Sequence, residues 1–435
     1  MQRSQSQVSS DSQPEHDPNS KIEKTFLEKI AALPPPKMTK AATLLEVVRD
    51  CDNFPYPCCP HLQTWSSATV SRSATVSRAA SATPTTSPPS AARSSDLDPY
   101  SRALSNLWTF HLPYDPAPHG FLTHEVISNM RWTKHFYLDV GSQAIDLLAP
   151  SAEDLLPEDN GSWEVACSRI LDEQIEIARQ DNVLGKILGP KKKGEQFPIV
   201  GAKFDVGVDR SAIGLLGMIG RGAHMTVYSR VRSTSSLEDG DDEQQRELGK
   251  DLRFWIPRRH YSKSTYPGKL DQAVAGGVAR GETPWECIVR EAVEEAGSAL
   301  SKEFVRANAK AAGTVTWLNI SDRRAGPGQE GLINSGVLYV YDLELPDEGR
   351  NFRFEPVPGD IDSWAVMDTD EVMAAMKKLE FKPSCAVVMI DFLVRHGVIT
   401  AENEPDYAEI VSRLHRLLPL PTSSRREGHR EGNGV

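Results

Sequence analysis

The segment 276–298, GGVARGETPWECIVREAVEEAGS, concentrates side chains that could do chemistry. Glu291, Glu294 and Glu295 are close in sequence, and at about 100° per residue they fall on one arc of a helix. Carboxylates at helix spacing repel each other. Carboxylate oxygens suit Mg²⁺, which also binds phosphate oxygens, and the cation would offset the repulsion. The segment therefore predicts a site for a divalent cation, Mg²⁺ or Mn²⁺.

The same segment contains the signals of the helix that must position these carboxylates. Thr283 is placed to be the N-cap, Pro284 is tolerated at the first helical position, and Glu286 completes a capping box. Gly297 lies where a helix usually ends. Between these ends the apolar side chains recur at helical spacing: Trp285, Ile288, Val289, Ala292, Val293 and Ala296. We expect an amphipathic helix whose glutamates lie on another face than its apolar stripe.

A solvated acidic helix face is the alternative explanation for the three glutamates. It explains neither Arg290 nor the glycines at the two ends of the segment, Gly276 and Gly297. The metal-binding interpretation accounts for the whole pattern and is therefore favoured.

The spacing resembles the Nudix box, G-x5-E-x7-R-E-U-x-E-E-x-G-U, in which U is usually a bulky aliphatic residue. Each fixed position is occupied: Gly276, Glu282, Arg290, Glu291, Glu294, Glu295 and Gly297. Ser298 departs from the aliphatic residue that is typical of the last position. The resemblance implies an α/β fold, namely a Nudix α/β/α sandwich with a mixed sheet, and hydrolysis of the diphosphate of a small molecule.

The resemblance also implies roles for residues of the box. The metal ligands would be three side chains and one backbone carbonyl: Glu291, Glu294, Glu295 and Gly276. Arg290 would orient the glutamates through charge-assisted hydrogen bonds, which makes it a catalytic candidate together with them. Either Glu291 or Glu295 would be the general base, and the sequence leaves this choice open.

A wider resemblance points to the Nudix domain related to thiamine pyrophosphokinase in fungi and plants. It is carried by 254–277 (FWIPRRHYSKSTYPGKLDQAVAGG) and 381–407 (FKPSCAVVMIDFLVRHGVITAENEPDY). Segments 50–56 and 107–132 resemble the amino-terminal domain that accompanies it. Members of this family hydrolyse thiamine diphosphate and, preferentially, its damaged oxo and oxy forms to the monophosphate. The broader group is associated with oxidised guanine nucleoside diphosphates such as 8-oxo-dGDP, so both substrates stay open.

A non-catalytic Nudix-like binding module is the alternative from another class. Such modules typically lose glutamates of the box, whereas this chain keeps them. The enzyme is therefore the favoured interpretation.

Side chains outside the box are weaker candidates for contact with the substrate. Arg258, Arg259 and Lys263 follow an expected strand and could meet phosphate oxygens, or they could form a solvated basic turn. Asp271 could meet a ring nitrogen, or it could simply form a turn. Trp255 is expected in the core.

The chain is expected to contain two folded regions with polar segments around them. A smaller α+β domain is expected over 40–221, interrupted by a disordered insertion rich in Ser, Ala, Thr and Pro at 57–97. The Nudix domain with its carboxyl-terminal helices is expected over 222–420. The tail 1–39 is expected to be disordered or helical, and the tail 421–435 disordered.

Residue patterns predict individual elements within these regions. We expect helices at 162–180, 371–378 and 386–396, and strands at 224–231, 252–257 and 337–345.

Composition excludes some classes of protein. With a net charge of −11 over 435 residues, the chain is a poor candidate for binding nucleic-acid polymers, which needs clustered Lys and Arg. No apolar run reaches the roughly 20 residues that cross a membrane. The six cysteines form no C-x-x-C pair, which is typical of a reduced intracellular protein, and we expect a cytoplasmic location. The sequence does not predict an oligomeric state.

Overall fold

The computed structural model describes residues 41–57, 97–185, 187–188, 196–231 and 249–423. The expected insertion at 57–97 lies outside the described residues except for its two ends. The tail 1–39 and most of the tail 421–435 also lie outside them. All the described residues belong to one compact unit, so the boundary expected between 221 and 222 stays a prediction.

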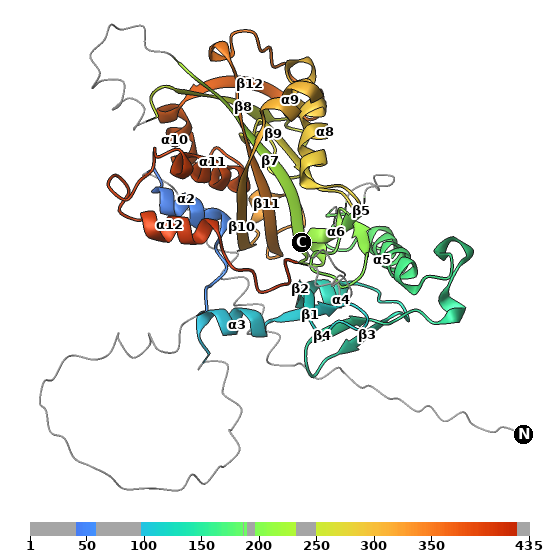
Figure 1. Cartoon of the computed structure of the whole chain (residues 1–435). Coiled ribbons are helices and arrows are strands. Elements are labelled where there is room, and N and C mark those ends of the chain that lie inside the picture. Colours follow the sequence, from blue (N-terminus) through green and yellow to red (C-terminus); the bar gives the residue numbers. More distant parts are fainter. Residues whose placement is uncertain (1–40, 58–96, 186, 189–195, 232–248, 424–435) are drawn as a thin grey trace, which may run out of the picture. The chain divides into compact units, whose positions relative to one another are not determined.

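A mixed sheet of six strands lies at the centre of the carboxyl-terminal half (Figure 1). In chain order its strands are β7 (Ile219–Arg230), β8 (Leu252–Arg259), β9 (Val274–Gly277), β10 (Lys310–Ile320), β11 (Ile333–Glu344) and β12 (Ile361–Asp368). The neighbours follow the order β10-β11-β7-β8-β12, and β9 pairs with β7. Strands β7 and β11 run parallel, and the other pairs are antiparallel. The mixed sheet expected from the sequence is confirmed.

Helices cover both faces of this sheet (Figure 1). One layer consists of α2 (Leu44–Cys51), α10 (Thr369–Lys377), α11 (Pro383–Arg395) and α12 (Tyr407–Leu414), and the other of α8 (Pro284–Ala296) and α9 (Lys302–Asn308). Along β11, Leu338 and Val340 belong to the first hydrophobic core, whereas Tyr341 and Leu343 belong to the second. Because successive side chains of a strand point to opposite faces, this alternation builds an α/β/α sandwich.

Helix α2 belongs to the carboxyl-terminal core, although the sequence places it in the amino-terminal domain expected over 40–221. Thr43 caps the helix, and Leu44, Val47 and Val48 are buried in the same cluster as α11 and α12. Asp52, just after the helix, accepts a hydrogen bond from Arg416 at 3.0 Å. Only these long-range contacts place α2, so the local pattern could not assign it to either region.

The region between 97 and 218 is α+β with a hydrophobic core of its own. Its four-stranded sheet has the order β2-β1-β4-β3, and a second sheet pairs β5 with β6. The strands are β1 (Leu107–His111), β2 (Pro118–Thr123), β3 (Phe136–Asp139), β4 (Ala144–Leu147), β5 (Gln196–Pro198) and β6 (Gly207–Asp209). The helices are α3 (Pro99–Ser105), α4 (His124–Asn129), α5 (Trp163–Gln180) and α6 (Ala212–Leu215). Short 3₁₀ turns in this region are η2 (Ala152–Asp154) and η3 (Pro157–Asp159). Those in the carboxyl-terminal half are η4 (Gly297–Ala299), η5 (Arg323–Ala325) and η6 (Asp347–Gly349).

Most of the expected elements lie close to their expected places. The helix expected at 162–180 is α5, and the strand expected at 252–257 begins β8. Strand β7 begins earlier than expected, because Gly220 and Gly222 resemble a turn in the sequence. A Cβ atom on Gly222 would lie 2.7 Å from the Cδ2 atom of Leu338 on β11, so a larger residue here would require that leucine side chain to move. In the described part of the chain no helix has the length and apolar character to cross a membrane.

Candidate active site

The box forms a strand, a loop and the helix α8, with the limits that the caps predict. The Oγ1 atom of Thr283 accepts a hydrogen bond from the Glu286 amide at 3.2 Å, and Glu286 accepts one from the Thr283 amide at 2.9 Å. The helix ends at Gly297, whose φ is 56°. Its buried face packs against the sheet, although Val293, expected in the apolar stripe, is exposed. Burial of that face fixes which way the glutamates project.

Arg290 gathers three carboxylates of the box. Its guanidinium forms a fork with Glu282, in which Nε donates at 2.8 Å and Nη2 at 3.1 Å. Its Nη1 donates to Glu291 at 2.8 Å and to Glu294 at 3.1 Å. The loop glutamate and two helix glutamates therefore share one cation, in a geometry that favours strong charge-assisted hydrogen bonds.

Two glutamates of α8 lie against the backbone of β9. A Cβ atom on Gly276 would lie 2.0 Å from the carboxyl carbon of Glu291, so only glycine leaves room for that side chain. Glu295 accepts a hydrogen bond from the amide of Ala275 at 2.7 Å. Strand β9 thus forms a cradle for both carboxyl groups.

Burial shifts the acidity of the two cradled glutamates. Burial raises the pKa of Glu291 above its ordinary value, although Arg290 opposes the shift. Burial raises the pKa of Glu295 well above its ordinary value, and the charges of Asp271 and Glu291 raise it further. Glu294 by contrast is exposed. Both carboxyl groups of the cradle therefore bind a proton more readily than an exposed glutamate does.

The donor set has the chemistry that a hard divalent cation requires. Carboxylate oxygens and a backbone carbonyl are ligands that Mg²⁺ accepts, and a cation would stabilise the charged forms of Glu291 and Glu295. Within the described residues, however, no group of three His, Cys, Asp or Glu side chains converges on one point suited to a metal. Glu291 and Glu294 turn to Arg290 instead, and Glu295 turns to the Ala275 amide.

The expected substrate-contact residues lie at the end of β8 and in the loop network after β8, because the strand is longer than expected and includes Arg258 and Arg259. Arg259 donates to Asp271 at 2.5 Å, and Arg258 donates to the carbonyl of Gly268 at 2.7 Å. Lys263 pairs with Asp360. Asp271 and Lys263 both shift the pKa of Glu295, so their charges lie within electrostatic reach of the box.

Asp271 is a buried charge rather than an exposed turn residue. It is 8% exposed and accepts a hydrogen bond from the Sγ atom of Cys385 at 2.7 Å. Burial raises its pKa, but Lys382 and Arg259 hold that pKa well below its usual range. Asp271 therefore stays charged beside the box.

Several residues near the box were not singled out by the sequence. His224 on β7 is buried, and within the described residues its Nδ1 atom has no hydrogen-bond partner. Phe197 on β5 packs against Gly277, and the charge of Arg210 lowers the pKa of Glu291. The last two come from a region far away in sequence, so no local spacing pattern could connect them with the box.

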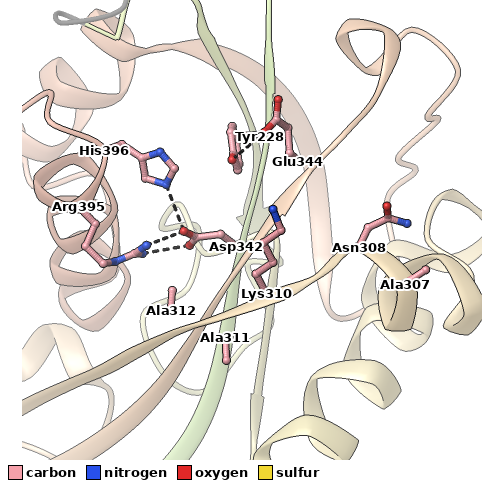
Figure 2. Close-up of a pocket in the computed structure, with 10 residues that line it drawn as sticks. All are labelled: Tyr228, Ala307, Asn308, Lys310, Ala311, Ala312, Asp342, Glu344, Arg395 and His396. Atoms are coloured by element: carbon pink, nitrogen blue, oxygen red, sulfur yellow. Dashed lines mark hydrogen bonds and ion pairs between the residues drawn. The ribbon is translucent and has the colours of Figure 1, made fainter.

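A cavity elsewhere in the molecule does not provide a better site. It measures about 440 Å³, and the residues that line it lie outside the box (Figure 2). Arg395 donates to Asp342 at 2.5 and 3.0 Å, and His396 lies 3.1 Å from the same carboxylate. Its central carboxylate is therefore already paired, and the box remains the candidate active site.

Comparison with known proteins agrees with the geometry of the box. The family model described as NUDIX domain matches residues 242–386. The uncharacterized protein YJR142W of Saccharomyces cerevisiae is 36% identical, over 57% of this chain and 68% of its own length. Nudix hydrolase 24, chloroplastic, of Arabidopsis thaliana is 34% identical, over 58% of this chain and 62% of its own length. The chain thus spans about two thirds of the yeast relative and less than two thirds of the plant relative.

A solved structure from Deinococcus radiodurans is 23% identical over 40% of this chain and 83% of that protein, but its TM-score is only 0.26. The assignment therefore depends on the sequence relatives and the family model. Because that model covers the box and the yeast relative aligns over more than two thirds of its own length, the chain belongs to the Nudix family of hydrolases.

Proposed function

We propose that this Nudix hydrolase cleaves the diphosphate of thiamine diphosphate, or of its damaged oxo and oxy forms, to the monophosphate and phosphate. The observation that carries the hydrolytic part is the cradle of β9, in which Glu291 and Glu295 are half-buried with raised pKa values. Such perturbed carboxyl groups beside a glycine strand suit a cation and a diphosphate. The thiamine part is supported by the sequence resemblance.

The proposed residues have two roles in the reaction: some hold the charged cation and diphosphate, and one accepts a proton. Mg²⁺ or Mn²⁺, when bound, would offset the charge of the diphosphate and make a water more acidic. Glu291, Glu294, Glu295 and the carbonyl of Gly276 are the proposed ligands. Arg290 keeps the glutamates in place through the hydrogen bonds described above.

The chemical step would be a substitution at phosphorus. The oxygen of a water would form a bond to one phosphorus, and the bond from that phosphorus to the bridging oxygen would break. Glu295 is the favoured base, because its raised pKa brings it closer to the pH at which proton transfer is efficient. Glu291 is the second candidate for the same role.

The loop network after β8 is the proposed contact with the rest of the substrate. Lys263, Arg258 and Arg259 would face the phosphates, since Lys263 already lies within electrostatic reach of Glu295. Asp271 is held charged, and a charged acceptor suits the protonated nitrogen of a heterocycle. A polar ring joined to a diphosphate would therefore span Asp271 and the box.

An oxidised nucleoside diphosphate is the alternative substrate for the same site. The test incubates the purified protein and Mg²⁺ with thiamine diphosphate, oxothiamine diphosphate, 8-oxo-dGDP and ADP-ribose in parallel, and quantifies the phosphate products. Preference for oxothiamine diphosphate with release of phosphate is the expected result. Preference for 8-oxo-dGDP would replace the thiamine proposal, and no turnover would favour a binding module.

A cytoplasmic location is also proposed. The cysteine pattern supports it, whereas the Arabidopsis relatives are named chloroplastic. Imaging of a fluorescent fusion of the full chain would decide, and an organellar signal would contradict the proposal.

A further inference from the structure

The loop between β9 and α8 is held by the amino-terminal region through Arg280. Nη1 of Arg280 donates to Ser168 on α5 at 3.1 Å and to Gln196 on β5 at 2.9 Å. Its Nε donates to the carboxylate of Asp205 at 3.0 Å, and Nη2 donates to the carbonyl of the same residue at 3.0 Å. One side chain of the box loop therefore contacts three separate segments of the other region.

The socket that receives Arg280 is fixed by contacts of its own. Ser168 is buried and accepts a hydrogen bond from the amide of Gly207 at 3.1 Å. Gln196 donates to Asp172 at 2.6 Å. A Cβ atom on Gly207 would lie 2.8 Å from the Cδ atom of Arg280, so this glycine leaves space for the arginine. The socket is part of the fold of the amino-terminal region rather than a chance surface contact.

A second contact reaches the box beside the first. A Cβ atom on Gly277 would lie 2.2 Å from the ring of Phe197, so the phenyl ring packs directly on the backbone of β9. Phe197 is buried, and Arg210 lies 5.4 Å above its ring. The amino-terminal region thus holds the box at both the end of β9 and the following loop.

The loop that Arg280 holds in place is connected to the glutamates by hydrogen bonds. Glu282 follows Arg280 by two residues and forms the fork with Arg290, which in turn binds Glu291. A shift of the loop would move Glu282, release Arg290 and change the place of the glutamate carboxyl groups. Displacements of about 1 Å in an active site can lower turnover by roughly 100-fold.

We propose that the amino-terminal region is a working part of the active site, in which Arg280 is a positioning residue that fixes the box loop and, through Glu282 and Arg290, the catalytic glutamates. This inference rests on the proposed hydrolase function. The competing explanation is that Arg280 only contributes stability to the contact between the two regions.

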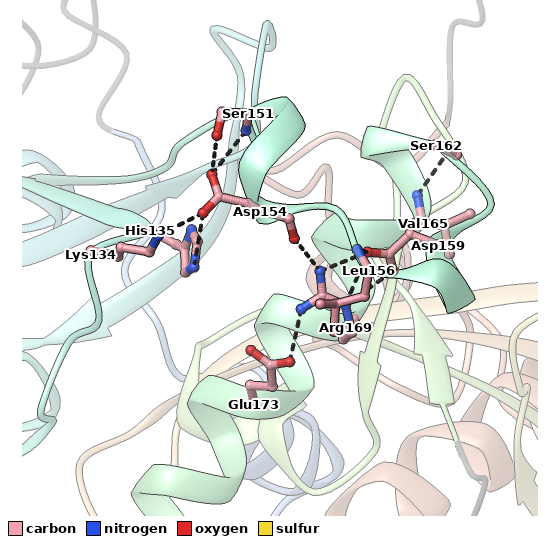
Figure 3. A network of polar contacts seen from close by, with 10 residues as sticks. All are labelled: Lys134, His135, Ser151, Asp154, Leu156, Asp159, Ser162, Val165, Arg169 and Glu173. Carbon is pink, nitrogen blue, oxygen red and sulfur yellow. Dashed lines mark hydrogen bonds and ion pairs between the residues drawn. The ribbon is translucent and has the colours of Figure 1, made fainter.

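Arg169 provides a matched control for this competing explanation. It neighbours Ser168 on α5, its side chain is 18% exposed compared with 23% for Arg280, and it also binds three groups. It forms a fork with Asp159, donates to Glu173 at 2.8 Å and donates to the carbonyl of Asp154 at 2.8 Å (Figure 3). These partners all belong to the amino-terminal region and not to the box, although Arg169 lines the same cavity as Arg280.

The experiment compares Arg280→Ala, Arg280→Lys and Arg169→Ala in the full chain. Hydrogen exchange of peptides covering 276–291 is measured, together with kcat, Mn²⁺ binding by electron paramagnetic resonance, and thermal unfolding. We expect Arg280→Ala to speed exchange in these peptides, to weaken Mn²⁺ binding and to lower kcat by about tenfold or more. Arg280→Lys keeps the charge but loses the planar fork, so it should fold well and show an intermediate effect.

Arg169→Ala should lower the unfolding temperature as much as Arg280→Ala but leave exchange at 276–291 unchanged and kcat within about twofold. Equal exchange at 276–291 in wild type and Arg280→Ala would overturn the proposal, and so would an equal increase in Arg169→Ala. Exchange needs neither metal nor substrate. If the wild-type protein hydrolyses none of the diphosphates, the proposed function fails while exchange still decides the positioning role.

Discussion

Two helices of this protein carry nearly the same arrangement of arginine and carboxylates. On α8, Arg290 forms a fork with Glu282 from the preceding loop and binds Glu294 one turn further along. On α5, Arg169 forms a fork with Asp159 from the preceding turn and binds Glu173 one turn further along (Figure 3). The hydrogen bonds alone do not distinguish the two clusters.

The balance of charge distinguishes them. The hydrogen bonds from Arg169 hold the pKa of Asp159 below its usual range, although burial opposes the shift. On α8, burial raises the pKa of Glu291 and of Glu295, and neighbouring carboxylates raise both pKa values further. Both clusters contain an arginine fork, and the half-buried carboxyl groups with raised pKa values on α8 are the feature that suits a cation.

The largest expected difference between the clusters is in catalysis. Glu295→Gln and Glu294→Gln should each lower kcat by about 10²–10⁴-fold, since they remove a proposed ligand charge and, at Glu295, the favoured base. Glu173→Gln is the matched change on α5 and should leave kcat near that of the wild type. Steady-state kinetics with the preferred diphosphate measures all three, and circular dichroism controls for folding. Wild-type turnover in both box variants would remove the metal assignment.

Substitution of the glycine that lies against Glu291 should lower kcat by a smaller factor than substitution of a glutamate. Gly276→Ala places a methyl group 2.0 Å from the Glu291 carboxyl carbon, so the side chain must move and kcat should fall about tenfold. Gly220→Ala is the control on β7, because the nearest atoms there are 3.7 Å away. If Gly276→Ala were as active as Gly220→Ala, Glu291 would not need its place against β9.

The dependence of stability on pH should differ in sign between the clusters. A carboxyl group whose pKa is raised by folding binds protons more tightly in the folded state. Glu291 and Glu295 should therefore lower the free energy of unfolding as pH rises above their ordinary value of 4.5. Asp159 has a lowered pKa, so its contribution is present above its ordinary value of 3.8 and is lost as pH falls below it.

Denaturant unfolding between pH 2 and pH 8 in the presence of a chelator measures this contrast, over a range of about six pH units. Glu295→Gln should flatten the fall of stability with rising pH, and so should saturating Mg²⁺. Glu173→Gln should leave it unchanged. A wild-type stability that rises over the upper part of this range and does not respond to Glu295→Gln would contradict the raised pKa.

The smallest expected effect is at the loop network after β8. Lys263→Ala should raise KM a few-fold with little change in kcat, because a contact made equally in the ground state and the transition state changes only binding. Lys134→Ala is the control, since this exposed lysine pairs with Asp154 at 2.7 Å in the amino-terminal region. An unchanged KM would show that Lys263 forms its ion pair with Asp360 but does not contribute to substrate binding.

Local signals explain which parts of the fold were predictable. The ends of α8 follow from Thr283, Pro284 and Gly297, because caps act within one helical turn. The beginning of β7 was missed, because Gly220 and Gly222 resemble a turn locally and this segment becomes a strand by pairing with β11, which is far away in sequence. The position of α2 depends in the same way on α11 and α12.

The sequence by itself determined the chemistry of the box, because residue type and helical spacing place Arg290 beside its glutamates. Only the tertiary structure decided that Glu295 lies against the Ala275 amide of β9, that Asp271 is a buried charge, and that Arg280 enters a socket of the amino-terminal region. Burial and partner choice depend on segments that meet only after folding, so the acidity of a side chain and its partners cannot be read from its neighbours in the chain.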